Sequence, residues 1–272
     1  MSDDTKENKM NSLLPETSKA LSDILKSLYS DLAQPGIQII GKNLAKAFDF
    51  CCIPLQAMGY CSDKFKLNLT HRLTEYGKKL EKIPEENQCE VDPQIGAPIL
   101  EHLSYTTNDE IADLFTTLLA NASNTHTLDK AHPSFVHLIS RLSVDEARIV
   151  KYLQDEDEIP HCSFQAIVSE QEDYAFITIV DHVTLIPFKV ELSFPNNVSA
   201  YLSNLISLGI LRNNDSSWKD DERAYNEICD KYYLSLYKEQ YKRPEYNQVK
   251  VDKGYYEVTS LGRLFIDACI KK

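Results

Sequence analysis

Three histidines near the middle of the chain are the residues whose types first suggest chemistry. His126, His132 and His137 stand close together, with several carboxylates around them. Histidines bind one zinc ion from a single helix at spacing i, i+4, which places both side chains on one face. His132 and His137 are five apart, so on a helix their side chains would diverge by roughly 140°. Since His132 also precedes a proline, we predict no metal site here.

Other reactive side chains form no enzyme motif. The consecutive carboxylates from Asp155 to Glu158 point in different directions on a turn and repel one another, so we interpret them as a solvated acidic loop. His161 and Cys162 are neighbours in the sequence, whereas the partners of a nucleophilic dyad usually meet only in space. The chain has eight glycines and lacks the patterns G-x-x-x-x-G-K-S/T, G-x-G-x-x-G and G-x-S-x-G. We expect no enzyme, no cofactor and no metal.

Charge argues against a nucleic-acid partner. The net charge is -12, and residues 83–195 hold 20 Asp and Glu against 5 Lys and Arg. Binding to a phosphate backbone needs clustered cations, because it is driven by the release of counterions. The acidic middle of the chain offers no such cluster.

Composition and cysteines indicate a folded cytoplasmic protein. The chain is 43% hydrophobic and 26% charged, which is typical of a soluble globule. The first twelve residues are polar and charged and have no features of a signal peptide. The seven cysteines include no C-x-x-C pair, and we expect reduced thiols.

The N-terminal part of the chain predicts helices. Apolar residues at helical spacing in 13–34 stop at Pro35-Gly36, and the apolar segment 36–60 contains too many charges for a simple membrane span. A third stripe, from Phe65 to Leu80, has Arg72 and several lysines over its other faces. Residues 36–82 fit either a helical hairpin packed on the protein or a basic amphipathic surface on an anionic membrane.

The histidine stretch lies between helix-start signals. A short helix is expected from Ile95 to Thr106, and Asn108 caps the next one ahead of two acidic residues. Pro133 can begin a helix in its first turn. Ser143 with Glu146 forms a capping box for a following helix over 144–153. We therefore interpret the stretch as a helix, a cap and a second helix.

The C-terminal part predicts strands and helices together. Residues 174–194 are β-branched and aromatic and indicate two strands or one hairpin, followed by a helix over 196–209. A tyrosine-rich helix, a strand and a closing helix follow. This order is typical of a winged-helix domain. We predict a mainly α protein with an N-terminal helical region and a winged-helix-like α+β C-terminal domain, divided into a disordered tail (1–12), a helical region (13–154) and the α+β domain (155–272).

The candidate recognition helix of that domain bears on its partner. Recognition helices present Arg, Lys, Asn or Gln to bases and phosphates. The helix over 196–209 contains no cation, and Arg212 lies past its end. Protein interaction is therefore favoured, with a DNA-binding regulator through 196–214 as the alternative.

One block of the sequence resembles a known family. The segments "KIPEENQCEVDPQIGAPILEHLSYTTNDEIADLFTTLLANASN" and "HPSFVHLISRLSVDEARIV" closely resemble the abortive infection alpha family. The resemblance extends over roughly residues 36–270 and is specific in this central block. The candidate motif or interaction residues that it marks are Pro93, Pro98, Glu101, Asp109, Glu110, Asn121, His132, Pro133, Ser134, Phe135, Ser143 and Asp145.

The resemblance implies a role in defence against phage, in which an infected cell is arrested or lost before progeny mature. It carries over no catalytic residue. We expect a cytoplasmic protein that binds a phage or host protein and no nucleic acid, with self-association left open. A membrane-perturbing effector through 36–82, peripheral to the inner membrane, is a further alternative.

Overall fold

The computed structural model describes residues 40, 43–47, 63–168, 175–215 and 222–271. The chain forms two compact units, one made of residues 1–142 and 267–272 and the other of residues 143–266. We refer to them as the helical unit and the sheet unit. The predicted helix over 13–34 and nearly all of the segment 36–60 lie outside the described residues.

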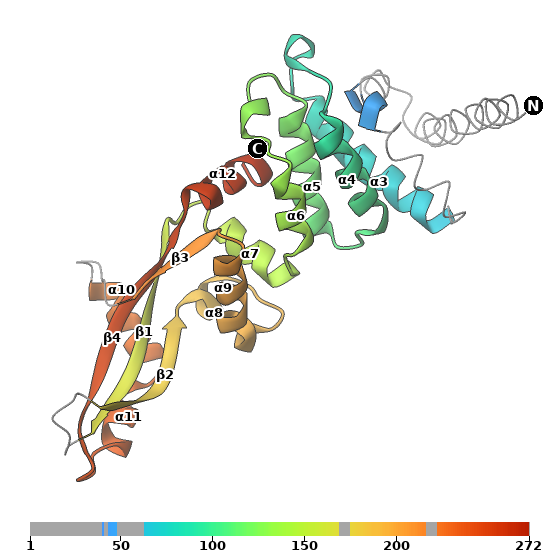
Figure 1. The fold of residues 1–272 in the computed structure, drawn as a ribbon. Helices are drawn as coiled ribbons and strands as arrows, with labels where there is room; N and C mark the ends of the chain where they lie inside the picture. Colours follow the sequence, from blue (N-terminus) through green and yellow to red (C-terminus); the bar gives the residue numbers. More distant parts are fainter. Residues whose placement is uncertain (1–39, 41–42, 48–62, 169–174, 216–221, 272) are drawn as a thin grey trace, which may run out of the picture. The chain divides into compact units, whose positions relative to one another are not determined.

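Helices pack side by side in the helical unit (Figure 1). They are α3 (Asp63–Leu80), α4 (Pro93–Tyr105), α5 (Asp109–Ala122) and α6 (Ser134–Ser140), with short 3-10 turns at Glu85–Asn87 and Leu128–Lys130. Helices α3 and α4 pack on α5, and α6 packs on α4 and α5. The predicted stripe of α3 is confirmed, since Leu69, Leu73, Tyr76 and Leu80 are buried.

Local start signals set the beginnings of these helices. Asp92 accepts a hydrogen bond from the Gln94 amide ahead of the first turn of α4. The Asn108 side chain accepts from the amides of Glu110 and Ile111 and begins α5, as predicted. Such caps satisfy backbone donors that have no partner within the helix.

The sheet unit combines a four-stranded antiparallel sheet with short helices (Figure 1). Its elements in chain order are α7 (Val144–Tyr152), β1 (Glu158–Val168), β2 (Phe176–Thr184), α8 (Ile186–Lys189), a 3-10 turn (Pro195–Asn197), α9 (Val198–Ser207), β3 (Leu211–Asn214), α10 (Glu222–Lys231), α11 (Leu234–Gln240), β4 (Tyr246–Val258) and the first part of α12 (Ser260–Cys269), which passes into the helical unit at Asp267. The strand order is β2-β1-β4-β3. Helix α10 covers one face of the sheet, where Tyr225 and Ile228 pack against Cys162 and Phe164. The mainly helical composition with an α+β second part is as predicted.

Two details of the predicted C-terminal part are wrong. Residues 175–194 hold the single strand β2 and then the short helix α8, instead of two strands or one hairpin. The partner of β2 is β1, which starts at Glu158 within the acidic stretch. The tyrosine-rich segment forms α10 and α11 instead of one helix, because Tyr233 adopts a left-handed conformation with φ of 55° between them.

The predicted domain ranges, with a boundary after residue 154, stay a prediction. By its contacts α7 groups with the sheet unit, where it packs against α9. Within the described residues, none of the helices has the length and apolar character needed to cross a membrane.

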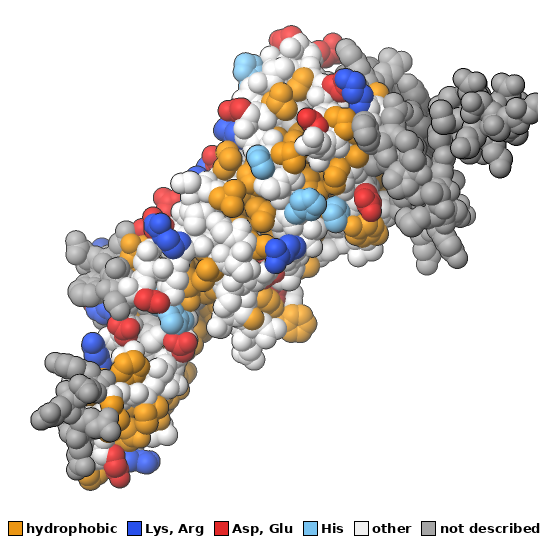
Figure 2. Space-filling model, viewed as in Figure 1, with side chains coloured by type: hydrophobic (Ala, Val, Ile, Leu, Met, Phe, Trp, Pro, Cys, Tyr) orange, Lys and Arg blue, Asp and Glu red, His pale blue; other side chains and the backbone are white. Residues whose placement is uncertain are grey.

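Charged side chains of the two signs are interspersed on the surface. On the face shown in Figure 2, the Lys and Arg side chains of the described residues are scattered and form no continuous patch. Exposed large apolar side chains of the sheet unit include Phe176, Phe188 and Phe194.

Candidate functional site

The candidate motif residues lie on four helices and at their starts, three of these helices in the helical unit and one in the sheet unit. Pro93, Pro98 and Glu101 lie on α4; Asp109, Glu110 and Asn121 on α5; His132, Pro133, Ser134 and Phe135 at the start of α6; Ser143 and Asp145 at the start of α7. Whether any of them contacts a partner stays a prediction.

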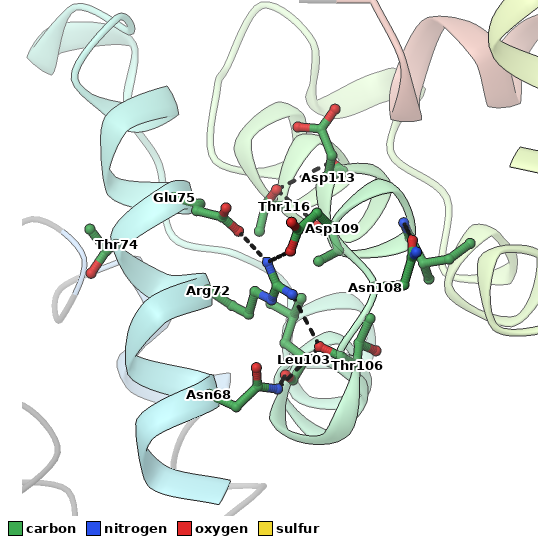
Figure 3. A network of polar contacts seen from close by, with 12 residues as sticks. Asn68, Arg72, Thr74, Glu75, Leu103, Thr106, Asn108, Asp109, Asp113 and Thr116 are labelled. Atoms are coloured by element: carbon green, nitrogen blue, oxygen red, sulfur yellow. Dashed lines mark hydrogen bonds and ion pairs between the residues drawn. The ribbon is translucent and has the colours of Figure 1, made fainter. Parts of the chain in front are cut away.

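Asp109 belongs to a polar network centred on Arg72 (Figure 3). The sequence suggested that Arg72 lies on a polar face of α3, but its side chain is only 3% exposed. Its guanidinium pairs with Glu75 at 3.1 Å and Asp109 at 2.8 Å and donates to the carbonyls of Thr106 and Thr107. The network joins α3 to the turn between α4 and α5.

Asn68 lies one turn before Arg72 and completes this contact. Its amide donates to the carbonyls of Leu103, Ser104 and Thr106 at 2.9, 3.1 and 3.1 Å. The last carbonyls of a helix have no partner within it. Asn68 and Arg72 therefore stabilise the C-terminal end of α4 from a neighbouring helix.

The histidine stretch makes local contacts at the start of α6, and its structural role stays a prediction. The Nδ1 atom of His132 lies 2.7 Å from the Ser134 hydroxyl oxygen and accepts from the Ser134 amide at the start of α6. Phe135 is fully buried, while His132 and His137 are exposed. The Asn121 amide donates to the carbonyl of Ala268 in the helical unit.

The predicted capping box at the start of α7 is confirmed and extends into a buried acidic pair. Glu146 accepts from the Ser143 amide at 2.6 Å and from the Asn204 amide at 2.8 Å. Asp145 is 3% exposed. It accepts from the backbone amides of Ser193 and Phe194 and from the Tyr201 hydroxyl. These two carboxylates tie α7 to α9 and to the loop before it.

Asp145 provides a pH-dependent prediction. Burial raises the pKa of its carboxyl, but the hydrogen bonds from Ser193, Phe194 and Tyr201 outweigh burial and place the pKa below its ordinary value. A depressed native pKa stabilises the fold above the unfolded pKa, and this contribution is lost as pH falls through the native pKa. We expect Asp145→Asn to lower the free energy of unfolding by about 2 kcal/mol at neutral pH. The NH2 group of asparagine would face the N–H and O–H donors that the carboxylate now accepts from.

The measurement is urea unfolding of both proteins at several pH values from neutral to acidic. The difference in free energy of unfolding between the unmodified protein and Asp145→Asn should be largest at pH 7. It should shrink only below the ordinary carboxyl pKa of about 3.9. A difference that is already absent at pH 7, or that does not change in acid, would contradict the assignment.

A second polar cluster, formed by His161, His182 and Asp215, lies in the sheet unit. His161 is on β1, His182 is on β2, and Asp215 directly follows β3. The Nε2 atom of His182 is 2.9 Å from Asp215 Oδ1, and the Nε2 atom of His161 is 3.6 Å from the same oxygen. The two imidazole rings lie 4.6 Å apart by their centroids.

Neighbouring groups hold both imidazoles. Asp181 Oδ1 lies 2.6 Å from the Nδ1 atom of His182, and the Ser163 hydroxyl donates to the same carboxylate. Asn213 Oδ1 lies 2.9 Å from the Nε2 atom of His161. Ser163 thus positions Asp181 and donates to no imidazole nitrogen, so this is not the arrangement of an activated serine nucleophile.

The two imidazoles differ in proton affinity. Burial lowers the pKa of His161, and the hydrogen bond that its Nε2–H donates to Asn213 Oδ1 opposes this shift. Burial also lowers the pKa of His182, but the hydrogen bond with Asp215 and the charge of Asp181 outweigh it, so the pKa is raised. The same pairing with His182 overcomes burial and lowers the pKa of Asp215. At neutral pH, His161 is the neutral imidazole.

An open groove of about 480 Å³ adjoins this cluster. Asp181 and His182 line it, together with residues of α8, the start of α9 and α10–α11, namely Pro187, Phe188, Pro195, Asn196, Val198, Ser199 and Tyr232. Phe188 is 52% exposed, and Phe194, which precedes Pro195 in the sequence, is 66% exposed. Apolar walls with a few convergent polar groups are typical of a binding site.

The comparisons with known proteins identify the family. The sequence profile of the abortive infection alpha family matches residues 65–269. The chain belongs to this family. Membership indicates a role in abortive infection, which is a form of defence.

A solved structure of an uncharacterized protein from the hydrocarbon-degrading marine bacterium Alcanivorax borkumensis SK2 is similar to the chain. The similarity covers 49% of this chain and 90% of that one, with 15% sequence identity and a TM-score of 0.32. No curated protein matches the chain.

Proposed function

We propose that this protein acts in anti-phage defence by binding a phage or host protein through the groove of the sheet unit. The observation that carries the proposal is the exposed aromatic side chain of Phe188 in the lining of that groove. The exposed Phe194 directly precedes the lining residue Pro195 in the sequence. An exposed aromatic side chain in a groove with apolar walls is typical of an interaction surface. Aromatic residues are also enriched among those that dominate binding energy.

The charge of α9 favours a protein over a nucleic acid. Its exposed positions are Ser199, Ala200, Ser203 and Ser207. No Lys or Arg occurs between Lys189 and Arg212. A nucleic-acid interface needs cations for its phosphates, and this helix supplies none.

We infer that the sheet unit is winged-helix-like, with a protein as its ligand. The chain order supports this: helix α7, strand β1, helices α8 and α9, then the antiparallel strands β3 and β4. Strand β4 lies between β1 and β3, as in a compact three-stranded wing sheet, with β2 added at the edge. The alternatives of a DNA-binding regulator and of a membrane effector through 36–82 stay predictions.

The test is phage challenge of bacteria that express the protein or the double variant Phe188→Ser/Phe194→Ser. Bacteria with the unmodified protein should survive a low phage-to-cell ratio and arrest or collapse at a high one. Protection, measured as the reduction in plaque counts, should be at least about tenfold weaker with the double variant. Truncating a side chain that anchors an interface typically weakens the binding free energy by roughly 2 kcal/mol or more.

Phe176→Ser is the matched control. Phe176 is on β2 of the same unit, and its exposed fraction of 51% is nearly equal to that of Phe188. Circular dichroism should show that all variants fold. If the double variant protects as well as the unmodified protein, the groove is not the interface. If no phage of a broad panel is affected at either ratio, the proposed role fails.

A further inference from the structure

The cluster of His161, His182 and Asp215 has the composition of a metal site. Each residue offers one ligand atom, and the three atoms lie within 4.8 Å of one another. Two imidazoles and a carboxylate form the protein ligand set of many open zinc sites, in which a further position is left for water or a substrate. The set comes from three separate strand regions, so it is assembled only by the folded sheet.

The distances fit a single small ion. Two ligand atoms about 2.0–2.1 Å from one zinc ion at the tetrahedral angle are roughly 3.3 Å apart. The separations of Asp215 Oδ1 from the Nε2 atoms of His182 and His161, 2.9 and 3.6 Å, lie on either side of that value. These two separations therefore differ from the ideal value by a few tenths of an ångström, and the two imidazole ligand atoms lie within 4.8 Å of each other.

The groups around the cluster match those that support metal ligands. Asp181 accepts from the Nδ1 side of His182, which directs Nε2 toward Asp215. Metal-binding histidines usually donate their other nitrogen to such a carboxylate. Asn213 Oδ1, 2.9 Å from His161 Nε2, adds an oxygen at the same point. His161 differs from His182 in this respect, because its Nδ1 atom has no hydrogen-bond partner within the described part of the chain.

The backbone is specially shaped to bring the two imidazoles together. The pairing of β1 with β2 is irregular between Cys162 and Phe164, opposite His182, whose φ is 46°. Bulges of this kind redirect side chains, and positive φ is unfavourable for a histidine. Gly254 on β4 leaves room for the other ring, since a Cβ there would lie 2.4 Å from His161 Cε1.

We propose that His161, His182 and Asp215 bind a divalent transition-metal ion of the zinc class. The ion joins β1, β2 and the end of β3, and Asp181 orients His182 toward it. Because His182 and Asp181 also line the groove, the ion holds one wall of the groove in place. The metal site goes beyond the proposed function, and its test does not depend on whether the groove binds a protein.

The first experiment is a calorimetric titration of the whole protein with zinc. Its affinity tag is removed beforehand, and any bound metal is stripped with a chelator. We expect one zinc ion per chain at this site and a rise in the melting midpoint. Asp215→Asn and His182→Asn should each weaken zinc binding by at least tenfold. Asparagine tolerates the positive φ at position 182, so this variant should fold. Asp181→Asn should weaken binding by roughly tenfold to a hundredfold.

His137→Ala is the matched control, because His137 is exposed on α6 in the other unit. It should bind zinc like the unmodified protein. If the unmodified protein binds no zinc, or if Asp215→Asn and His182→Asn bind as tightly as His137→Ala, the proposal is overturned.

Cobalt absorption separates this site from cysteine-based binding. Co²⁺ bound to nitrogen and oxygen ligands shows visible d–d bands without the near-ultraviolet charge-transfer band of a thiolate. We expect that spectrum, and we expect it to vanish in Asp215→Asn. A thiolate band that persists in the variant would show that cysteines bind the metal, and the proposal would fall.

Discussion

Replacing Arg72 by alanine is expected to lower the free energy of unfolding of the helical unit by about 3 kcal/mol. The side chain is buried along its length, and its guanidinium donates to the carbonyls of Thr106 and Thr107. Without it, the Thr107 carbonyl loses this donor, the Thr106 carbonyl keeps the hydrogen bond from Asn68, and the space of the long side chain is left empty. Chemical unfolding followed by circular dichroism measures the loss.

Two companion variants identify the cause. Lys78→Ala removes the same charge from an exposed position of α3, and it should change stability by less than about 0.5 kcal/mol. Asp109→Ala removes an ion-pair partner whose side chain is 84% exposed, and should cost at most about 1 kcal/mol. A loss for Arg72→Ala no larger than that for Lys78→Ala would show that the network does not hold α3 to α4 and α5.

The helical unit is largely predictable from sequence because its determinants are local. Asn108 and Ser143 are recognisable as helix caps from the residues that follow them, and both have that role. The role of Arg72 is not predictable in this way. Its position on α3 suggests a solvated face, and its burial depends on the C-terminal end of α4, which the sequence pattern of α3 does not contain.

The sheet and its histidine cluster are harder to predict because they depend on long-range pairing. Strand β1 begins in an acidic stretch and includes Pro160, so its local sequence hardly indicates a strand. His161 could be considered only beside Cys162, its neighbour in sequence. The meeting of His161 with His182 and Asp215 requires the register of β1 with β2, an irregularity in that pairing and the end of β3. The spacing of residues along the sequence indicates none of these three features.

Phe135→Ala is expected to have a still larger effect, a loss of about 4 kcal/mol in the free energy of unfolding. Phe135 is fully buried on α6, which packs against α4 and α5. Truncation removes the apolar contacts of the ring and leaves a cavity that the surrounding helices fill only in part. The same chemical unfolding experiment measures it, and the resulting population of unfolded protein should also reduce phage protection.

His132→Ala separates packing from partner contact within the same motif. His132 is exposed, and its Nδ1 atom contacts the hydroxyl and the amide of Ser134. Removing its side chain should therefore lower the free energy of unfolding by at most about 1 kcal/mol. If the motif is structural, this variant protects against phage and Phe135→Ala does not. If His132→Ala stays folded and loses protection, the start of α6 contacts a partner, and the motif residues act as the interaction surface that the family resemblance suggested.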